Sequence, residues 1–189
     1  FSGLNSLLAG REVTIYSGTG LLGSNRKIEI QQNGETEIIQ GTNVLLATGS
    51  TPRTIQGFEI DGKTVMTSDE FLSIEETPDR VAVIGGGAIG CEFASLLNDL
   101  GSSVTLLESL DEILPGCDKD VSTAVRRSFI KKGIDIQTGV QVEGHEGDAE
   151  KTTVSWSDKG EANQREVDLV VVAVGRKPNG HTAGLQDTE

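Results

Sequence analysis

The chain has 189 residues, 29 of them acidic and 16 basic, which gives a formal net charge of −13. Nucleic-acid binding needs clustered positive charge, so this balance argues against a nucleic-acid partner. No apolar run approaches the roughly 18 residues of a transmembrane helix, so we expect no membrane span. The length suffices for one good hydrophobic core or two small ones. The first residue is Phe1 and no signal peptide is visible, so we expect a fragment or a processed product.

The two cysteines and two histidines of the chain predict no metal site. Cys91 and Cys117 form no C-x-x-C pair and have no histidine motif beside them. Cys91 falls in the first turn of a predicted helix, where a helix dipole would lower a thiol pKa, but we interpret it as a buried apolar residue. His145 and His181 lie in polar stretches that contain glycine, and we predict both to be at the surface.

The first 50 residues predict the end of a helix followed by strands. Gly10 would stop the helix, and Asn33-Gly34 is a strong signal for a two-residue hairpin turn. The apolar run that ends before Thr48 is typical of a strand buried in a parallel sheet. The predicted segments are a helix end at 4–9, strands at 12–16, 28–30 and 36–39, and the buried strand at 43–47.

Residues 51–78 contain many loop-forming prolines and glycines, and we interpret them as a linker between two units. Within this span, Ser68 is expected to cap a short helix that runs to Leu72, because acidic residues occupy its first turn.

Residues 81–108 carry the most informative motif of the chain. An apolar run enters a G-x-G-x-x-G at Gly85, Gly87 and Gly90, a segment with helical periodicity follows, and a second apolar run ends in Glu108. This order predicts a dinucleotide-binding βαβ unit. Gly85 would permit the tight turn, Gly87 would let a pyrophosphate approach the backbone, and Gly90 would let the helix pack on the strand. The predicted helix places on one face Ile89, Phe93, Leu96, Leu97 and Leu100, and Gly101 would follow its end.

The start of this helix and the acid after the second strand favour a particular ligand. Free N–H groups at the helix start, together with the helix dipole, attract phosphates. Glu108 lies about twenty residues past the glycines, where a carboxylate accepts hydrogen bonds from ribose hydroxyls. A 2′-phosphate would be repelled there, and residues 109–112 offer no arginine to receive one, so NAD is favoured over NADP. FAD also uses this motif, so the motif alone does not exclude it.

The second half of the chain predicts a further helix, a strand, a β-meander and a second buried strand. Asp118 would cap the helix and Gly133 would stop it. The apolar face of this helix would consist of Val121, Ala124, Val125 and Phe129. The predicted segments are a helix at 118–133, a strand at 134–136, meander strands at 140–142, 152–156 and 164–166, and a buried parallel strand at 167–174.

The two buried strands end in similar sequences. Val-Leu-Leu-Ala-Thr-Gly at 44–49 resembles Val-Val-Ala-Val-Gly at 171–175, and a meander precedes each of them. We infer two nucleotide-binding units of related design. The opening strand and glycine loop of the first unit would then lie upstream of Phe1.

These segments resemble the FAD-dependent pyridine nucleotide–disulfide oxidoreductases. The matching residues are 45–53, 83–94, 104–108, 118–133 and 174–179, so the resemblance covers nearly the whole chain. It implies an α/β fold class. Residues 1–55 would be the C-terminal part of an incomplete FAD-binding domain. Residues 56–189 would be a Rossmann-like NAD-binding βαβ domain with a β-meander.

The resemblance also implies roles for single residues. The glycine loop would hold the NAD pyrophosphate, Glu108 the adenosine ribose, Val142 the adenine, and Gly175 would lie near the nicotinamide. Glu92 matches a family acid placed between flavin and nicotinamide, although an acid favoured by the helix dipole explains it equally well. The implied cofactor-binding residues are Gly85, Gly87, Ala88, Ile89, Gly90, Glu92, Glu108, Val142 and Gly175 for NAD, and Thr48, Gly49 and Ser50 for FAD.

The chain also departs from the family. It lacks the redox-active Cys-x-x-x-x-Cys, the N-terminal FAD glycine motif and the C-terminal dimerisation domain, so we assign no catalytic residue. The resemblance implies a whole protein that is a homodimer and passes electrons from a lipoyl-bearing protein, through a cysteine pair and flavin, to NAD. We expect it in the cytoplasm, or in the mitochondrial matrix or plastid if a transit peptide preceded the chain. Two alternatives stay open: an NADH oxidase or other disulfide reductase, and a non-catalytic NAD(H)-binding redox module.

Overall fold

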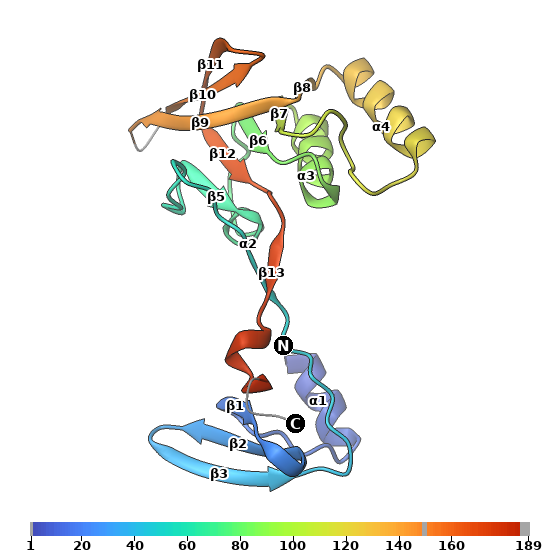
Figure 1. Ribbon diagram of the computed structural model, residues 1–189, viewed down its shortest axis with the longest axis vertical. Coiled ribbons are helices and arrows are strands. Elements are labelled where there is room, and N and C mark those ends of the chain that lie inside the picture. The colour runs from blue at the N-terminus through green and yellow to red at the C-terminus, as the bar shows by residue number, and fades with distance from the viewer. Residues whose placement is uncertain (1, 149–150, 186–189) are drawn as a thin grey trace. The chain divides into compact units, whose positions relative to one another are not determined.

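The computed structural model describes residues 2–148 and 151–185, and these form two compact units (Figure 1). The first unit takes its described residues from 1–50 and 178–189, and the second unit comprises 51–177. The chain passes between the units at β4 (Ser50–Pro52) and β13 (Arg176–Pro178), and these two strands pair with each other.

The first unit combines one helix with an antiparallel sheet of three strands. Its elements are α1 (Ser2–Gly10), β1 (Thr19–Leu22), β2 (Lys27–Gln32), β3 (Glu35–Gln40) and two 3₁₀ turns at Ser24–Arg26 and Gly180–Thr182. The predicted hairpin is confirmed, because Gln32 pairs with Glu35 across Asn33 and Gly34. Both turn residues have positive φ, 50° and 83°, as a type I′ turn requires.

The second unit contains a parallel sheet of five strands in the order β5-β12-β6-β7-β8, with a separate antiparallel meander of three strands. Strands β6, β7 and β8 follow one another outward from the middle, and β12 joins on the other side of β6, which is the strand order of a Rossmann-like unit. The predicted βαβ unit is therefore confirmed. The elements are β5 (Val65–Thr67), α2 (Ser68–Phe71), β6 (Arg80–Ile84), α3 (Ala88–Asp99), β7 (Ser103–Glu108), α4 (Lys119–Lys132), β8 (Asp135–Thr138), β9 (Val140–Gly147), β10 (Thr152–Asp158), β11 (Glu161–Val167) and β12 (Leu169–Val172).

The parallel sheet is covered on both faces. Successive residues of a strand point to opposite sides, so each strand contributes side chains to both cores. Helices α3 and α4 cover one face, and the meander covers the other, which gives three layers (Figure 1). The helix-side core includes Val81, Val83, Phe93, Leu97, Leu106 and Phe129. The meander-side core includes Phe58, Ala82, Ile84, Val154, Trp156 and Val172. The continuous apolar character of β6 and β12 follows from burial on both sides.

The strands predicted at 12–16 and 43–47 are not formed in the described structure. Val13 and Ile15 are 48% and 54% exposed, and Leu45 is 91% exposed. A strand needs a neighbour that accepts and donates its backbone hydrogen bonds, and neither segment pairs with a described strand. Both segments carry the apolar pattern of a strand, but neither lies beside a described strand with which it could pair.

The linker predicted at 51–78 is wrong, because most of this span packs into the second unit. Phe58 is 1% exposed, Val65 is fully buried, and β5 forms the edge of the parallel sheet beside β12. The short helix is present, but its cap is Thr67 rather than Ser68. The Thr67 side chain accepts from the Asp69 N–H, and Glu70 completes a capping box.

The predicted apolar faces of the two helices were only partly right. In α3, Leu96 and Leu100 are 47% and 59% exposed, whereas Ala94 and Cys91 are buried. Small residues fill the contact because the helix lies close against β6 and β7. In α4, Val121 is half-exposed and Ser122 is buried instead, where its hydroxyl donates to the Ile113 carbonyl at 2.9 Å. The ends of both helices agree with prediction, including a left-handed Gly133 after α4.

Two further predictions concerned the burial of Cys91 and the exposure of His145. Cys91 is buried as expected, and burial raises the pKa of its thiol to about 11, with nearby Glu108 acting in the same direction. His145 is not a free surface residue. Its ring stacks on Phe58 with centroids 5.4 Å apart, and its Nδ1 lies 2.9 Å from the Thr152 hydroxyl.

The described part of the chain contains no helix with the length and apolarity needed to cross a membrane. Within the same residues, no three side chains of the kinds that bind metals come together.

Asp61 predicts a pH dependence of stability. Its carboxylate accepts from the N–H groups of Lys63, Thr64 and Val65 at 2.7–2.9 Å, and from the Thr64 hydroxyl at 2.6 Å. Partial burial alone raises the Asp61 pKa, but these hydrogen bonds outweigh it and lower the pKa from 3.8 to about 2. A carboxyl whose pKa is lower in the folded state than in the unfolded state stabilises the fold at pH values above its unfolded-state pKa. This contribution is lost as pH falls through 3.8 toward 2.

We therefore expect Asp61→Ala to lower the free energy of unfolding at neutral pH by loss of these hydrogen bonds. The loss should be only about 1 kcal/mol, because the residue is largely exposed despite the slight burial of its carboxylate. Urea titrations at pH 7, 4 and 3 would measure it. The difference from wild type should shrink below pH 4. A difference that is constant or grows on acidification would contradict this role for Asp61.

Candidate nucleotide-binding site

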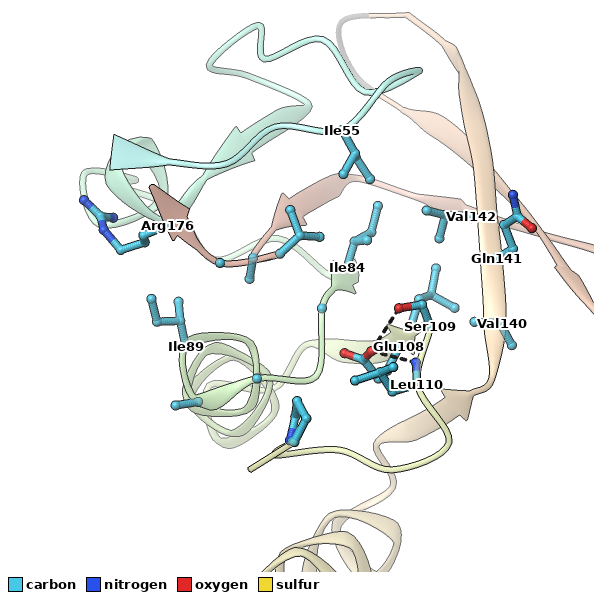
Figure 2. Close-up of a pocket in the computed structure, with 18 residues that line it drawn as sticks. Ile55, Ile84, Ile89, Glu108, Ser109, Leu110, Val140, Gln141, Val142 and Arg176 are labelled. Atoms are coloured by element: carbon cyan, nitrogen blue, oxygen red, sulfur yellow. Dashed lines mark hydrogen bonds between the residues drawn. The ribbon is translucent and has the colours of Figure 1, made fainter. Parts of the chain in front are cut away.

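A cavity of about 680 Å³ lies in the second unit at the carboxyl ends of β6, β7 and β12 (Figure 2). Parallel strands of open α/β sheets bind ligands at this edge, where the strand order changes direction. Its lining includes Ile84 at the end of β6, then Gly85, Gly87 and Ala88 from the loop that enters α3, and Gly175 after the end of β12. Most of the lining is apolar, with a few polar groups at fixed positions, as is typical of cofactor sites.

The cavity brings together seven of the residues predicted to bind NAD: Gly85, Gly87, Ala88, Ile89, Glu108, Val142 and Gly175. Gly90 lies below the loop and is buried. Glu92 is exposed on α3, beyond its first turn, and is not among the lining residues. Thr48, Gly49 and Ser50 belong to the first unit, where Asn179 contacts the carbonyls of Thr48 and Gly49 at 3.1 and 3.0 Å.

The three motif glycines differ in what a side chain would meet. At Gly85, φ is +109°, and a Cβ would collide with the Ala173 carbonyl. At Gly90, a Cβ would collide with the Gly85 carbonyl, because the helix lies directly on the loop. These two glycines are therefore required by the fold.

Gly87 is different, because it borders the cavity and a Cβ built there meets nothing within 4 Å. Its φ is −71° with extended ψ, so the backbone at this position does not need the conformational freedom of glycine. The open space beside Gly87 has the form expected of a place for the pyrophosphate. The residues present thus fit a dinucleotide.

The N-terminus of α3 faces the same space. Gly87 is the N-cap residue of α3. The first hydrogen bond within the helix runs from the Cys91 N–H to the Gly87 carbonyl, at 2.9 Å. The N–H groups before Cys91 have no partner within the helix, as at every helix start. With the helix dipole, they form a favourable site for a phosphate.

Glu108 is 7% exposed and is held by the backbone around it. One carboxylate oxygen accepts from the Gly86 N–H at 2.5 Å, and the other accepts from the Leu110 N–H at 2.8 Å and the Ser109 hydroxyl at 3.2 Å (Figure 2). Each oxygen retains acceptor capacity for a ligand hydroxyl. The carboxylate is therefore fixed in place before any ligand arrives.

The glycine loop is also held from its carbonyl side, which the sequence did not reveal. The Gly86 carbonyl accepts from the Leu114 N–H at 2.6 Å and from the Cys91 thiol at 3.3 Å. Leu114 has φ of +54°, a conformation that a leucine rarely adopts. Ile113 anchors this turn because it is fully buried.

Several lining residues were missed by sequence reasoning, namely Ile55, Leu110, Pro115, Val140 and Arg176. Leu110 and Arg176 each lie within two residues of a predicted site residue, and that adjacency was the available signal. Ile55 and Pro115 come from loops whose path depends on tertiary packing, so no local pattern pointed to them.

A parallel sheet, a glycine loop that enters a helix, and an acid at the end of the next strand define a Rossmann-like nucleotide-binding unit. The chain belongs to the pyridine nucleotide-disulphide oxidoreductase family, whose pattern matches residues 3–188. Relatives include the dihydrolipoyl dehydrogenases of Chlamydia pneumoniae, 37% identical over 98% of this chain, and of Bacillus subtilis, 34% identical over all of it. The dihydrolipoamide dehydrogenase of Chaetomium thermophilum is 39% identical over 97% of this chain.

Solved structures agree with this assignment. The HOCl-induced flavoprotein disulfide reductase RclA from Escherichia coli matches 99% of this chain with a TM-score of 0.81 and 25% identity. LpdA from Mycobacterium tuberculosis matches with a TM-score of 0.86 at 24% identity, which supports the fold alone. The chain spans only 39%, 42% and 37% of the three sequence relatives, and 42% of each of these structures.

Proposed function

We propose that this chain is the NAD(H)-binding portion of a flavoprotein disulfide oxidoreductase, most similar to dihydrolipoamide dehydrogenase. The observation that carries this proposal is the open position beside Gly87, in a cavity that also holds the backbone-fixed carboxylate of Glu108. A dinucleotide requires an acid for its ribose hydroxyls and open space beside a glycine for its pyrophosphate, and this cavity offers both. The sequence relatives support the same class of enzyme.

In this proposal, the protein residues bind and orient the dinucleotide. Glu108 accepts hydrogen bonds from the adenosine ribose, and Val142 packs beside the adenine. The start of α3 at Gly87 and Ala88 receives the pyrophosphate, and the nicotinamide extends toward Ile89 and Gly175. When bound, NAD supplies a ring that accepts or donates a hydride.

For the whole protein we propose that electrons pass from a lipoyl-bearing substrate to a cysteine pair, then to FAD, then to NAD. Residues 1–55 would belong to the FAD-binding domain, with Thr48, Gly49 and Ser50 near the flavin, and residues 56–189 to the NAD-binding domain. The two compact units of the structure are divided differently, because described residues of 178–189, which this proposal places in the NAD-binding domain, group with residues 1–50. A homodimer in the cytoplasm is part of the same proposal. The 189-residue chain contains no Cys-x-x-x-x-Cys, so we expect it to be inactive alone.

The chain is expected to bind NADH at least about tenfold more tightly than NADPH, a difference of roughly 1.4 kcal/mol. A 2′-phosphate would approach the buried Glu108 carboxylate, and Ser109 and Leu110 beside it offer no positive charge. Titration by nucleotide fluorescence measures both affinities. A second comparison, AMP against its 2′-phosphorylated form by calorimetry, restricts the test to the adenosine end. Equal affinities, or a preference for the phosphorylated ligands, would contradict the role of Glu108.

The purified 189-residue chain is expected to be colourless. The G-x-G-x-x-G that connects a strand to a helix, at Gly85, Gly87 and Gly90, belongs to the second unit. The same spacing at Gly18, Gly20 and Gly23 falls on strand β1 and opens no helix, so flavin has no glycine loop to hold its pyrophosphate in this chain. Absorbance between 350 and 500 nm, before and after incubation with excess FAD and gel filtration, provides the measurement. Stoichiometric flavin that survives gel filtration would contradict the prediction.

A further inference from the structure

The short helix α2 contacts two elements that shape the cavity. Arg176 lines the cavity at the end opposite Glu108 (Figure 2). Its Nη1 donates to Asp69 Oδ1 at 2.8 Å and to the Ser68 hydroxyl at 3.1 Å. On another side of α2, the Phe71 ring packs against Phe93 of α3 with centroids 4.5 Å apart. Thus α2 is joined both to the Arg176 corner and to the helix that begins at the glycine loop.

The helix α2 is itself firmly held, although four residues cannot form a stable helix alone. The Thr67 hydroxyl donates to Glu70 Oε2 at 2.5 Å, and the Thr67 N–H donates to the same oxygen at 2.8 Å. Ser68 and Phe71 are 7% and 4% exposed, and β5 leads into the helix from the edge of the sheet. It therefore provides a fixed point for Arg176.

The backbone at Gly175 and Arg176 needs such a fixed point. Gly175 has φ of +105°, so the chain turns sharply where it leaves β12. One side of this corner is held by Arg53, whose N–H donates to the Gly175 carbonyl at 2.9 Å and whose Nε donates to the Arg176 carbonyl at 3.3 Å. The Arg176 side chain ties the corner to α2 on the other side.

We propose that the Arg176–Asp69 ion pair is a positioning device that holds the Gly175 corner against the nicotinamide end of the bound dinucleotide. This inference rests on the proposed function, which places the nicotinamide at that end. The two side chains are 32% and 53% exposed, and ion pairs at such exposure contribute little to global stability. Removing the pair therefore loosens the corner and leaves the fold intact.

The test uses the 189-residue chain with Asp69→Asn, Arg176→Gln and both together. NADH is titrated beside ADP-ribose, which keeps the adenosine and the pyrophosphate but lacks the nicotinamide. Each single variant should weaken NADH about fivefold and ADP-ribose less than twofold. The double variant should be no weaker than the single variants, because the two residues act as one unit. Arg176→Lys should recover part of the NADH affinity, since it keeps the charge.

A matched control is available in the Lys132–Asp99 ion pair, which has a 2.7 Å separation and similar exposures of 38% and 57%. Asp99→Asn should leave both affinities unchanged, and thermal melts should show that all variants fold. An effect of Arg176→Gln without one of Asp69→Asn would mean that Arg176 contacts the nucleotide directly, and it would overturn the proposal. Equal losses for NADH and ADP-ribose, or no loss in either single variant, would also overturn it. A wild-type chain that does not bind NADH would instead refute the proposed function itself.

Discussion

Gly87→Val is expected to weaken NADH binding by at least about tenfold, or roughly 1.4 kcal/mol, while the protein stays folded. The isopropyl group would occupy the open space beside the glycine loop, where nothing lies within 4 Å of the Cβ position. The backbone there has φ of −71°, which valine adopts without strain. Valine is a poorer N-cap residue than glycine, so we expect a stability loss of about 1 kcal/mol. NADH titration and circular dichroism melting on the same sample give both values.

Two further variants make this test decisive. Gly87→Ala adds one methyl group in the same place and should weaken NADH less than valine does. Gly90→Ala has a different expected outcome, because its methyl group would strike the Gly85 carbonyl and the fold itself should suffer. If Gly87→Val folds and binds NADH as tightly as wild type, the nucleotide does not lie on this loop.

Phe58→Ala is expected to destabilise the second unit by about 3–5 kcal/mol, the range found for buried phenylalanines. The ring is 1% exposed, packs in the meander-side core and stacks on His145. Urea unfolding followed by the fluorescence of Trp156, which lies in the same core, measures the change. Leu72→Ala is the matched control, because this side chain comes from the same stretch and is 73% exposed. A loss below about 1 kcal/mol for Phe58→Ala would mean that residues 51–64 are not part of the core.

The prediction for residues 51–78 failed for a physical reason. Prolines and glycines in this span mark turns correctly, but turns do not show whether the residues between them are buried. Phe58 and Val65 are isolated apolar residues in a polar stretch. Phe58 is buried in the meander-side core and Val65 in the edge strand β5, and both positions depend on tertiary packing.

The βαβ unit could be predicted because every part of it is local. The glycines, the helix period and the terminal acid lie within 28 residues of sequence and stand in the order that the unit requires. The same glycine spacing at residues 18–23 lacks the helix and the acid, and it forms strand β1 instead. The clamp on Gly86 could not be predicted, since it depends on the Leu114 turn and on the unusual φ of that residue. The strands expected at 12–16 and 43–47 show the opposite failure, because an apolar pattern indicates a preference for strand but does not supply a neighbour.

The position of Trp156 has a practical consequence for spectroscopy. It is the one tryptophan of the chain, and it pairs across the meander with Val142, which lines the cavity. Its indole is 4% exposed, so its emission is shielded from water in the native state. Reduced nicotinamide absorbs light at the wavelengths at which tryptophan emits. The excitation energy of Trp156 should therefore be transferred to bound NADH and appear as nicotinamide emission. The protein thus contains its own donor for resonance energy transfer, and ligand occupancy can be followed without any attached dye.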